Sequence, residues 1–285
     1  MRADGFAKVN LALRVRPPDA SGLHPIRSLA HSVDWPDSIE MIDAEEDRFT
    51  VAGDESVPSN GSNLAVRALE AVREVAGRRP AALHLEKRIP AEAGLGGGSA
   101  DAAAVLVLAG RRFGVPRPVL ATLAPRLGAD VPFCLAGGAA WMEGYGERLG
   151  PLPGFSGFAL AVVVPALRLA TADVYRRWDR MGGPEGRGVS GRALPMPLRE
   201  HAPLVNDLLP AALDLQPALG DRIADLERRW GVPVLMSGSG PALFGLFPTA
   251  DEAAGAVEAA GEVRAGRACL PAPRGVTEPS DGTLR

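Results

Sequence analysis

The sequence has few cysteines and almost no lysine, and its acidic and basic residues nearly balance. Its formal net charge is −3 over 285 residues, so no basic field favours nucleic acid or an anionic membrane surface as a partner. The two cysteines, Cys134 and Cys269, match neither a metal-ligand spacing nor a disulfide framework, and we expect both to be reduced. These absences leave small molecules as the expected partners.

Long hydrophobic runs are also absent. No apolar stretch approaches the ~20 residues that a membrane-spanning helix requires, and the N-terminal residues lack the apolar core of a signal peptide. We therefore expect a cytoplasmic protein without a membrane partner. The oligomeric states left open are a monomer and a homodimer. With 46% hydrophobic residues, the chain can build one large or two medium domains around a sizeable core.

Arginine replaces lysine almost everywhere: of 31 basic residues, only Lys8 and Lys87 are lysine. A lysine retained in such a sequence either survives by chance or marks a place that suits a compact ammonium better than a planar guanidinium. Lys8 lies in residues 6–16, where alternating apolar side chains predict a strand. Lys8 and Asn10 then share one strand face, which points either into a cleft or to solvent.

The chain is organised around a glycine loop, in which Gly94, Gly96, Gly97 and Gly98 fall within five residues. A strand predicted to end at Ile89 leads into it, and an Ala/Val/Leu-rich helix follows. Glycine permits positive φ and close approach, so the backbone N–H groups and the helix N-terminus can together hold an anion such as a nucleotide phosphate. The alternative is a ligand-free connection, since the loop matches neither the P-loop nor the dinucleotide fingerprint.

The remaining patterns divide the chain into two domains. Residues 151–154, Pro-Leu-Pro-Gly, are the best linker candidate, so we expect a first domain over 1–150 and a second over 151–270. Helices are expected at 64–75, 118–127, 207–213, 216–230 and 250–260, and another begins near Thr171. Residues 232–247 predict two apolar strands joined by a Ser-Gly-Ser-Gly turn, and residues 271–285 are expected to be disordered.

Four motifs in this order resemble the 4-diphosphocytidyl-2-C-methyl-D-erythritol kinase family of the GHMP kinase superfamily: Ala7–Leu11, Pro90–Ala104, Leu127–Phe133 and Met236–Pro241. The resemblance implies an α+β fold of two domains, the first like ribosomal protein S5 and the second ferredoxin-like. It further implies ATP-dependent phosphorylation of the 2-hydroxyl of 4-diphosphocytidyl-2-C-methyl-D-erythritol, a step in non-mevalonate isoprenoid synthesis, with Mg²⁺.

The resemblance also implies roles for individual residues. Asp130, whose position before Pro132 by itself favours a helix N-cap, corresponds to the family's catalytic base, and Lys8 to its catalytic lysine. The substrate-binding residues are expected to be Asn10, His24, Thr171 and Tyr175. The residues expected to bind ATP are Asn63, Lys87, Pro90, Ala91, Glu92, Ala93, Gly94, Leu95, Gly96, Gly97, Gly98, Ser99 and Ala100.

Two positions depart from the family pattern. Leu23 replaces a tyrosine before His24, which removes one aromatic face for the cytosine ring. Ala100 replaces a serine that many members have, so Ser99, the phosphates and water are expected to hold the magnesium ion. Another small-molecule kinase of the superfamily, mevalonate- or homoserine-kinase-like, stays open as an alternative. A non-catalytic nucleotide-binding protein is the other, although Lys8 and Asp130 count against it.

Overall fold

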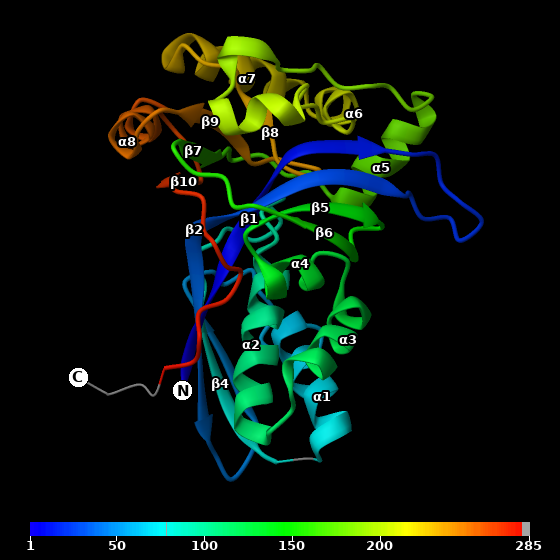
Figure 1. Cartoon of the computed structure of the whole chain (residues 1–285), viewed down its shortest axis with the longest axis vertical. Helices are drawn as coiled ribbons and strands as arrows, with labels where there is room; N and C mark the ends of the chain where they lie inside the picture. Colours follow the sequence, from blue (N-terminus) through cyan, green and yellow to red (C-terminus); the bar gives the residue numbers. More distant parts are fainter. Residues whose placement is uncertain (78, 281–285) are drawn as a thin grey trace.

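Two β-sheets organise the molecule, which the computed structural model describes for residues 1–77 and 79–280. Within these residues the first sheet contains six strands: β1 (Arg2–Val15), β2 (Ile26–Asp43), β3 (Arg48–Ala52), β4 (Ala81–Glu86), β5 (Ala139–Gly144) and β6 (Arg148–Leu152). Figure 1 shows helices gathered on one side of it, namely α1 (Leu64–Ala76), α2 (Gly97–Phe113), α3 (Arg117–Leu127) and α4 (Val131–Ala136).

The second sheet has the strand order β10-β7-β9-β8 and is antiparallel throughout. Its strands are β7 (Ala159–Val164), β8 (Leu235–Met236), β9 (Leu243–Phe247) and β10 (Ala265–Cys269). The helices of this half are α5 (Thr171–Arg180), α6 (Leu209–Leu215), α7 (Pro217–Trp230) and α8 (Ala250–Glu258), with 3-10 turns at Gly191–Ala193 and Met196–His201 (Figure 1). The mixed content confirms the predicted α+β class, and the expected helices are present with shifted ends.

Strand β2 is the centre of the first sheet. It pairs antiparallel with β1 along most of its length, while β5 pairs with residues 26–31 and β4 with residues 38–43. Because a strand has only two edges, β4 and β5 lie end to end along the edge that β1 leaves free. Between these two pairings, residues 32–37 of β2 contact side chains and loops on this edge rather than a third strand.

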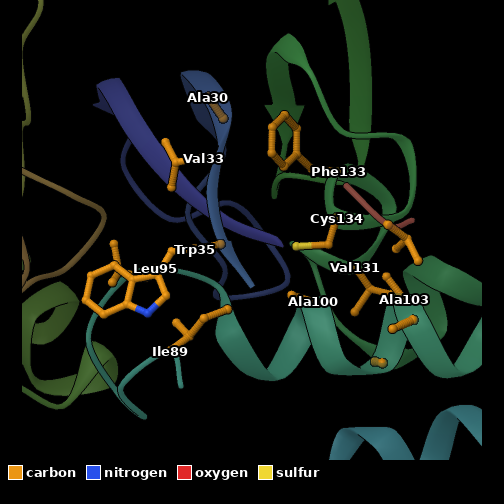
Figure 2. Close-up of a cluster of buried hydrophobic side chains, with 14 of the residues drawn as sticks. Ala30, Val33, Trp35, Ile89, Leu95, Ala100, Ala103, Val131, Phe133 and Cys134 are labelled. Atoms are coloured by element: carbon orange, nitrogen blue, oxygen red, sulfur yellow. The ribbon is translucent and has the colours of Figure 1, made fainter. Parts of the chain in front are cut away.

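Helix α2 is the most deeply buried helix of the first half, and each of its residues 100–110 is buried. Its alanines let it approach β1, β2 and the other helices closely, since small side chains reduce the separation of packed elements. Figure 2 shows Ala100 and Ala103 of this helix beside Val131 and Cys134 of α4 in one apolar cluster. This packing fixes the start of α2, and with it the end of the glycine loop.

Strand β1 contributes to both hydrophobic cores. Val9 and Leu11 belong to the core beneath α2, whereas Leu13 and Val15 belong to the core of the second half. Its pairing with β2 shifts register twice, and residues 7–13 are all buried. The simple alternation predicted for 6–16 is therefore interrupted, and the solvent-facing alternative for Lys8 and Asn10 is wrong because both faces of the strand are covered.

The segment predicted to be disordered from residue 271 is ordered as far as residue 280. It lies along β1, where the Phe6 N–H donates to the Gly275 carbonyl at 2.8 Å and the Thr277 N–H donates to the Asp4 carbonyl at 3.0 Å. The segment satisfies backbone groups that an edge strand would leave free. Its prolines hide this strand-like role from sequence patterns, and residues 281–285 lie outside the described residues. The expected linker also begins inside β6, which runs to residue 152.

Candidate active site

A cavity of about 920 Å³ is lined by elements of both halves of the chain. Most of the residues predicted for the site lie in its wall: Lys8, Asn10, His24, Pro90 through Ser99, Asp130, Thr171 and Tyr175. Sequence patterns did not identify several other lining residues, including Leu13, Ile26, Leu64, Tyr145, Arg176 and Asp179. The structure thus brings together in space the motifs that the sequence spreads over more than two hundred residues.

The glycine loop has the backbone geometry that its composition predicts. Gly94 and Gly96 have φ of 80° and 69°, a left-handed conformation that glycine adopts without steric cost. A Cβ on Gly94 would lie 2.4 Å from the Ser237 carbonyl oxygen, so the residue is also required for close approach. Glu92 adopts a φ of 56° without being glycine, a strained conformation of the kind that clusters at functional sites.

The first turn of α2 opens onto the cavity, whose wall includes residues 97–99. No side chain caps this helix, so its N-terminal N–H groups and positive dipole end are available to an anion. This arrangement favours the anion-binding interpretation over a ligand-free connection.

Lys8 and Asp130 form an ion pair in the same wall. The Lys8 Nζ lies 3.2 Å from Asp130 Oδ2, with side-chain exposures of 5% and 32%. Lys8 also donates to Asn10 Oδ1 at 2.5 Å, and the Asn10 amide donates in turn to Ser28 Oγ at 2.7 Å. This chain of hydrogen bonds holds the ammonium in place beside a carboxylate that solvent and substrates can reach.

Asp130 stands at the N-cap of α4, as its spacing predicts, but its side chain makes no capping hydrogen bond. The carboxylate turns instead toward Lys8. Its position at a helix start is thus correct, whereas the capping role that the position suggested is wrong.

A second turn, Met236–Pro241, here called the serine turn, holds the glycine loop from the side of the second sheet. Ser237 Oγ donates to the Gly94 carbonyl at 2.9 Å and accepts the Asn10 N–H at 3.1 Å. Ser239 Oγ lies 2.8 Å from Thr171 Oγ1 at the start of α5. The composition of this turn was visible in the sequence, but its contacts with the glycine loop were not.

His24 lies in the cavity wall beside residues of α5. Its Nε2 lies 2.8 Å from Asp179 Oδ1, and its ring centroid lies 5.0 Å from that of Tyr175 and 5.7 Å from that of Trp178. Burial, assisted by the charge of Asp130, raises the pKa of Tyr175 to about 12, so the phenol stays neutral at physiological pH. Asp179 was missed because it lies 155 residues from its partner.

The loop that carries His24 is fixed at a second point. The Tyr145 hydroxyl donates to Asp19 Oδ2 at 2.5 Å, which ties the loop before β2 to the turn between β5 and β6. Leu23, the residue that departs from the family pattern, is 53% exposed and also lines the cavity.

Three residues predicted to bind ATP are absent from the cavity wall. Asn63 caps α1, since its Oδ1 accepts the Ala65 N–H at 2.9 Å. Lys87 is buried and its ammonium is bound by two carboxylates. Ala100 is fully buried in the core under the loop, so a serine there would place its hydroxyl in the core rather than in the cavity.

Neither a cluster of metal-ligating side chains nor a membrane-spanning helix occurs within residues 1–77 and 79–280. These residues contain no group of three or more His, Cys, Asp or Glu side chains placed to hold a metal ion. None of their helices is both long and apolar enough to cross a membrane. Cys134 and Cys269 are both buried and are not bonded to each other.

Comparison with known proteins relates this chain to a family of kinases. The family description "GHMP kinases N terminal domain" matches residues 63–138, and "GHMP kinases C terminal" matches residues 197–264. A 4-diphosphocytidyl-2-C-methyl-D-erythritol kinase of Mesorhizobium japonicum is 39% identical over 269 residues, which cover 90% of this chain and 89% of the relative. The kinase of the same name from Anaeromyxobacter dehalogenans is 41% identical, with 88% of this chain and 82% of the relative covered.

Solved structures give the same relationship. A crystal structure of 4-(cytidine 5'-diphospho)-2C-methyl-D-erythritol kinase superimposes with a TM-score of 0.79 at 36% identity, covering 95% of this chain and all of the other. A homoserine kinase from Cytophaga hutchinsonii has a TM-score of 0.70 at 16% identity, with 97% of this chain and 96% of the other covered. At that identity the second match shows a shared fold alone.

Proposed function

This chain belongs to the 4-diphosphocytidyl-2-C-methyl-D-erythritol kinase family. We propose that residues of its cavity catalyse transfer of the γ-phosphoryl group of ATP to the 2-hydroxyl of 4-diphosphocytidyl-2-C-methyl-D-erythritol, which we call the cytidyl alcohol. The chain is a small-molecule kinase of the non-mevalonate route to isoprenoid precursors. The observation that carries the proposal is the Lys8–Asp130 pair, which lies in the same cavity wall as the N-terminus of α2. A base and a cation beside an anion-binding helix end are what phosphoryl transfer to an alcohol requires.

Asp130 acts as the general base in this proposal. Its carboxylate accepts the proton of the 2-hydroxyl as the alcohol oxygen bonds to the γ-phosphorus, and the bond to the β–γ bridging oxygen breaks to release ADP. Lys8, held by Asn10 at 2.5 Å, stays beside the carboxylate and stabilises negative charge on the transferring group. Its burial limits its movement, so little orientation entropy is lost during transfer.

The glycine loop and the first turn of α2 receive the ATP phosphates. The backbone N–H groups at the N-terminus of α2 can donate to phosphate oxygens because no N-cap side chain already accepts from them. When bound, Mg²⁺ would supply charge neutralisation of the phosphates, and this ion usually needs only a few protein oxygens, with water completing its shell. Ser99 and Glu92 are the oxygen-bearing side chains of the loop in the cavity wall, and they fit such a sparse donor set.

The cytidyl end of the alcohol occupies the part of the cavity around His24. The imidazole there is held by Asp179 and lies near Tyr175, so a polar ring edge and an aromatic face are both available to a nucleobase. Leu23 contributes apolar contact in place of a second aromatic face. Thr171, positioned through Ser239 at 2.8 Å, lies in the wall between this end and the serine turn.

The proposal is tested by supplying the protein with ATP, magnesium and one alcohol at a time, and detecting the phosphorylated product by mass spectrometry. We expect product from the cytidyl alcohol and none from mevalonate or homoserine, because only the first has a base for the His24 end. Product from mevalonate or homoserine alone would overturn the substrate assignment. ATP binding without any product would favour a non-catalytic nucleotide-binding protein.

A further inference from the structure

A buried group of three charges lies beneath the glycine loop, outside the cavity wall. The Lys87 ammonium donates to Asp37 and to Asp101 Oδ2, the latter at 2.8 Å. The three side chains are 2% exposed or less. Removing charges from water is unfavourable unless they are paired, so this group requires an explanation that the surface ion pairs do not.

The group ties together both ends of the glycine loop. Lys87 directly follows β4 and precedes the loop, while Asp101 lies on α2 immediately after it. Asp37, on the central strand β2, accepts the N–H groups of Arg88 and Ile89 at 2.5 and 2.8 Å through its other oxygen. Entry, exit and central strand are therefore joined through one ammonium.

We propose that Asp37, Lys87 and Asp101 form a positioning group that holds the glycine loop and the first turn of α2 in the shape that receives the ATP phosphates. The inference rests on the proposed function, because it assigns the loop to ATP. None of the three residues lines the cavity, so their effect on the nucleotide is transmitted through the backbone they hold. Sequence reasoning placed Lys87 in direct contact with the nucleotide, whereas the structure gives it this indirect part.

The geometry also explains why this position retains lysine in a chain that otherwise uses arginine. A Cβ built on Gly97 would lie 2.9 Å from the Lys87 Nζ and 3.0 Å from the Ile89 Cγ2. The ammonium therefore sits directly under the first residue of α2, where the planar and larger guanidinium has no room. Figure 2 shows Ile89 in the apolar cluster near the start of the helix.

The charges of the group are not balanced, so substitution of a carboxylate and substitution of the ammonium should have different effects. Two carboxylates share one ammonium, and Asp101 Oδ1 has no hydrogen-bond partner among the described residues. Burial, together with the neighbouring Asp37 charge, raises the pKa of Asp101. An amide at 101 keeps an oxygen that can accept from the ammonium, whereas loss of the ammonium leaves two buried carboxylates without a cation.

The experiment compares Lys87→Arg, Lys87→Met and Asp101→Asn in the full chain. Isothermal titration with a non-hydrolysable ATP analogue and, separately, with the cytidyl alcohol measures each affinity, and circular dichroism monitors folding. We expect both Lys87 variants to lose at least about 10-fold in affinity for the analogue while affinity for the alcohol stays within about 3-fold. Asp101→Asn keeps an oxygen that accepts from the ammonium but loses the buried charge, so affinity for the analogue should fall less than in Lys87→Met, and affinity for the alcohol should stay within about 3-fold of the wild type.

Several outcomes separate this proposal from the proposed function. Wild-type affinity for the analogue in Lys87→Arg, equal losses for both ligands, or an Asp101→Asn loss as large as that of Lys87→Met would each overturn the positioning group. Lys87→Met leaves two buried carboxylates without a cation and so can fail to fold. In that case the double variant Lys87→Met/Asp101→Asn, which retains only the Asp37 carboxylate, should fold yet bind the analogue weakly. A wild-type chain that binds no analogue would instead refute the assignment of ATP to the loop.

Discussion

Replacement of Asp130 by asparagine separates a catalytic carboxylate from a structural one. Asparagine is as good an N-cap as aspartate, and its amide oxygen can still accept from the Lys8 ammonium that lies 3.2 Å from the carboxylate. The substitution therefore removes the proposed base while leaving the helix start and most of the local packing intact. We expect turnover to fall while ATP affinity stays near the wild-type value.

The magnitudes expected for turnover and for stability differ widely. Loss of a general base lowers kcat by about 10²–10⁴-fold, which corresponds to about 2.7–5.5 kcal/mol in activation free energy. The effect on folding should be much smaller, because Asp130 is 32% exposed and its side chain makes no capping bond. A partly exposed pair contributes ~1 kcal/mol or less, equivalent to a shift of ~4 °C or less in Tm.

The assay measures initial rates of ADP formation with the cytidyl alcohol, together with thermal unfolding of the same preparation. Asp214→Asn is the matched control, since Asp214 pairs with Arg177 at 2.5 Å on the surface and lies outside the cavity wall. Its kcat should equal that of the wild type. A kcat for Asp130→Asn within about 5-fold of the wild type would refute the assignment of Asp130 as the base.

The other predictions probe the loop, the cytidyl end and the pH dependence of folding. Gly94→Ala would place a Cβ 2.4 Å from a serine-turn carbonyl oxygen at a φ of 80°. The free energy of unfolding should therefore fall by at least ~1 kcal/mol, and titration should show weaker ATP binding. Full wild-type stability would contradict this. Asp179→Asn replaces the carboxylate that holds His24. It should raise KM for the cytidyl alcohol about 10-fold and leave KM for ATP unchanged. An equal rise in both KM values would argue against a role of Asp179 at the cytidyl end. Burial lowers the pKa of His31 from its ordinary value of 6.5, so the unfolded chain binds the proton first and folding stability falls as the pH drops below about 6.5. Denaturant unfolding of His31→Gln should show a weaker loss on acidification, whereas the exposed His84→Gln should behave like the wild type.

The residues of the proposed catalytic pair, Lys8 and Asp130, could be named as candidates from sequence because short motifs contain them. Lys8 stood out as one of two lysines, and Asp130 belonged to a motif shared with a kinase family. What the motifs left open was the direction of each side chain. Only the fold turned Asp130 away from the helix it precedes and toward Lys8.

The partners of distant residues could not be predicted in the same way. His24 and Asp179 are 155 residues apart, and Asp37 meets Lys87 across 50 residues. Because side-chain pairing depends on which strands and helices become neighbours, spacing along the chain carries no signal for such contacts. In the same way, the sequence does not show that the Asn63 side chain caps α1, and its expected contact with the nucleotide stays a prediction.

The sequence by itself determined the local elements: the glycine loop with its positive φ values, the alanine-rich helix that follows it, and the motifs of the kinase family. These depend on backbone freedom and on side-chain size, which each residue carries regardless of its neighbours in space. The tertiary structure alone decided which charges meet. Of two lysines that composition marked equally, one reaches the cavity beside Asp130, and the other is buried beneath the loop between Asp37 and Asp101. The difference arises because a charge takes its role from the partners and the burial that the packed chain provides.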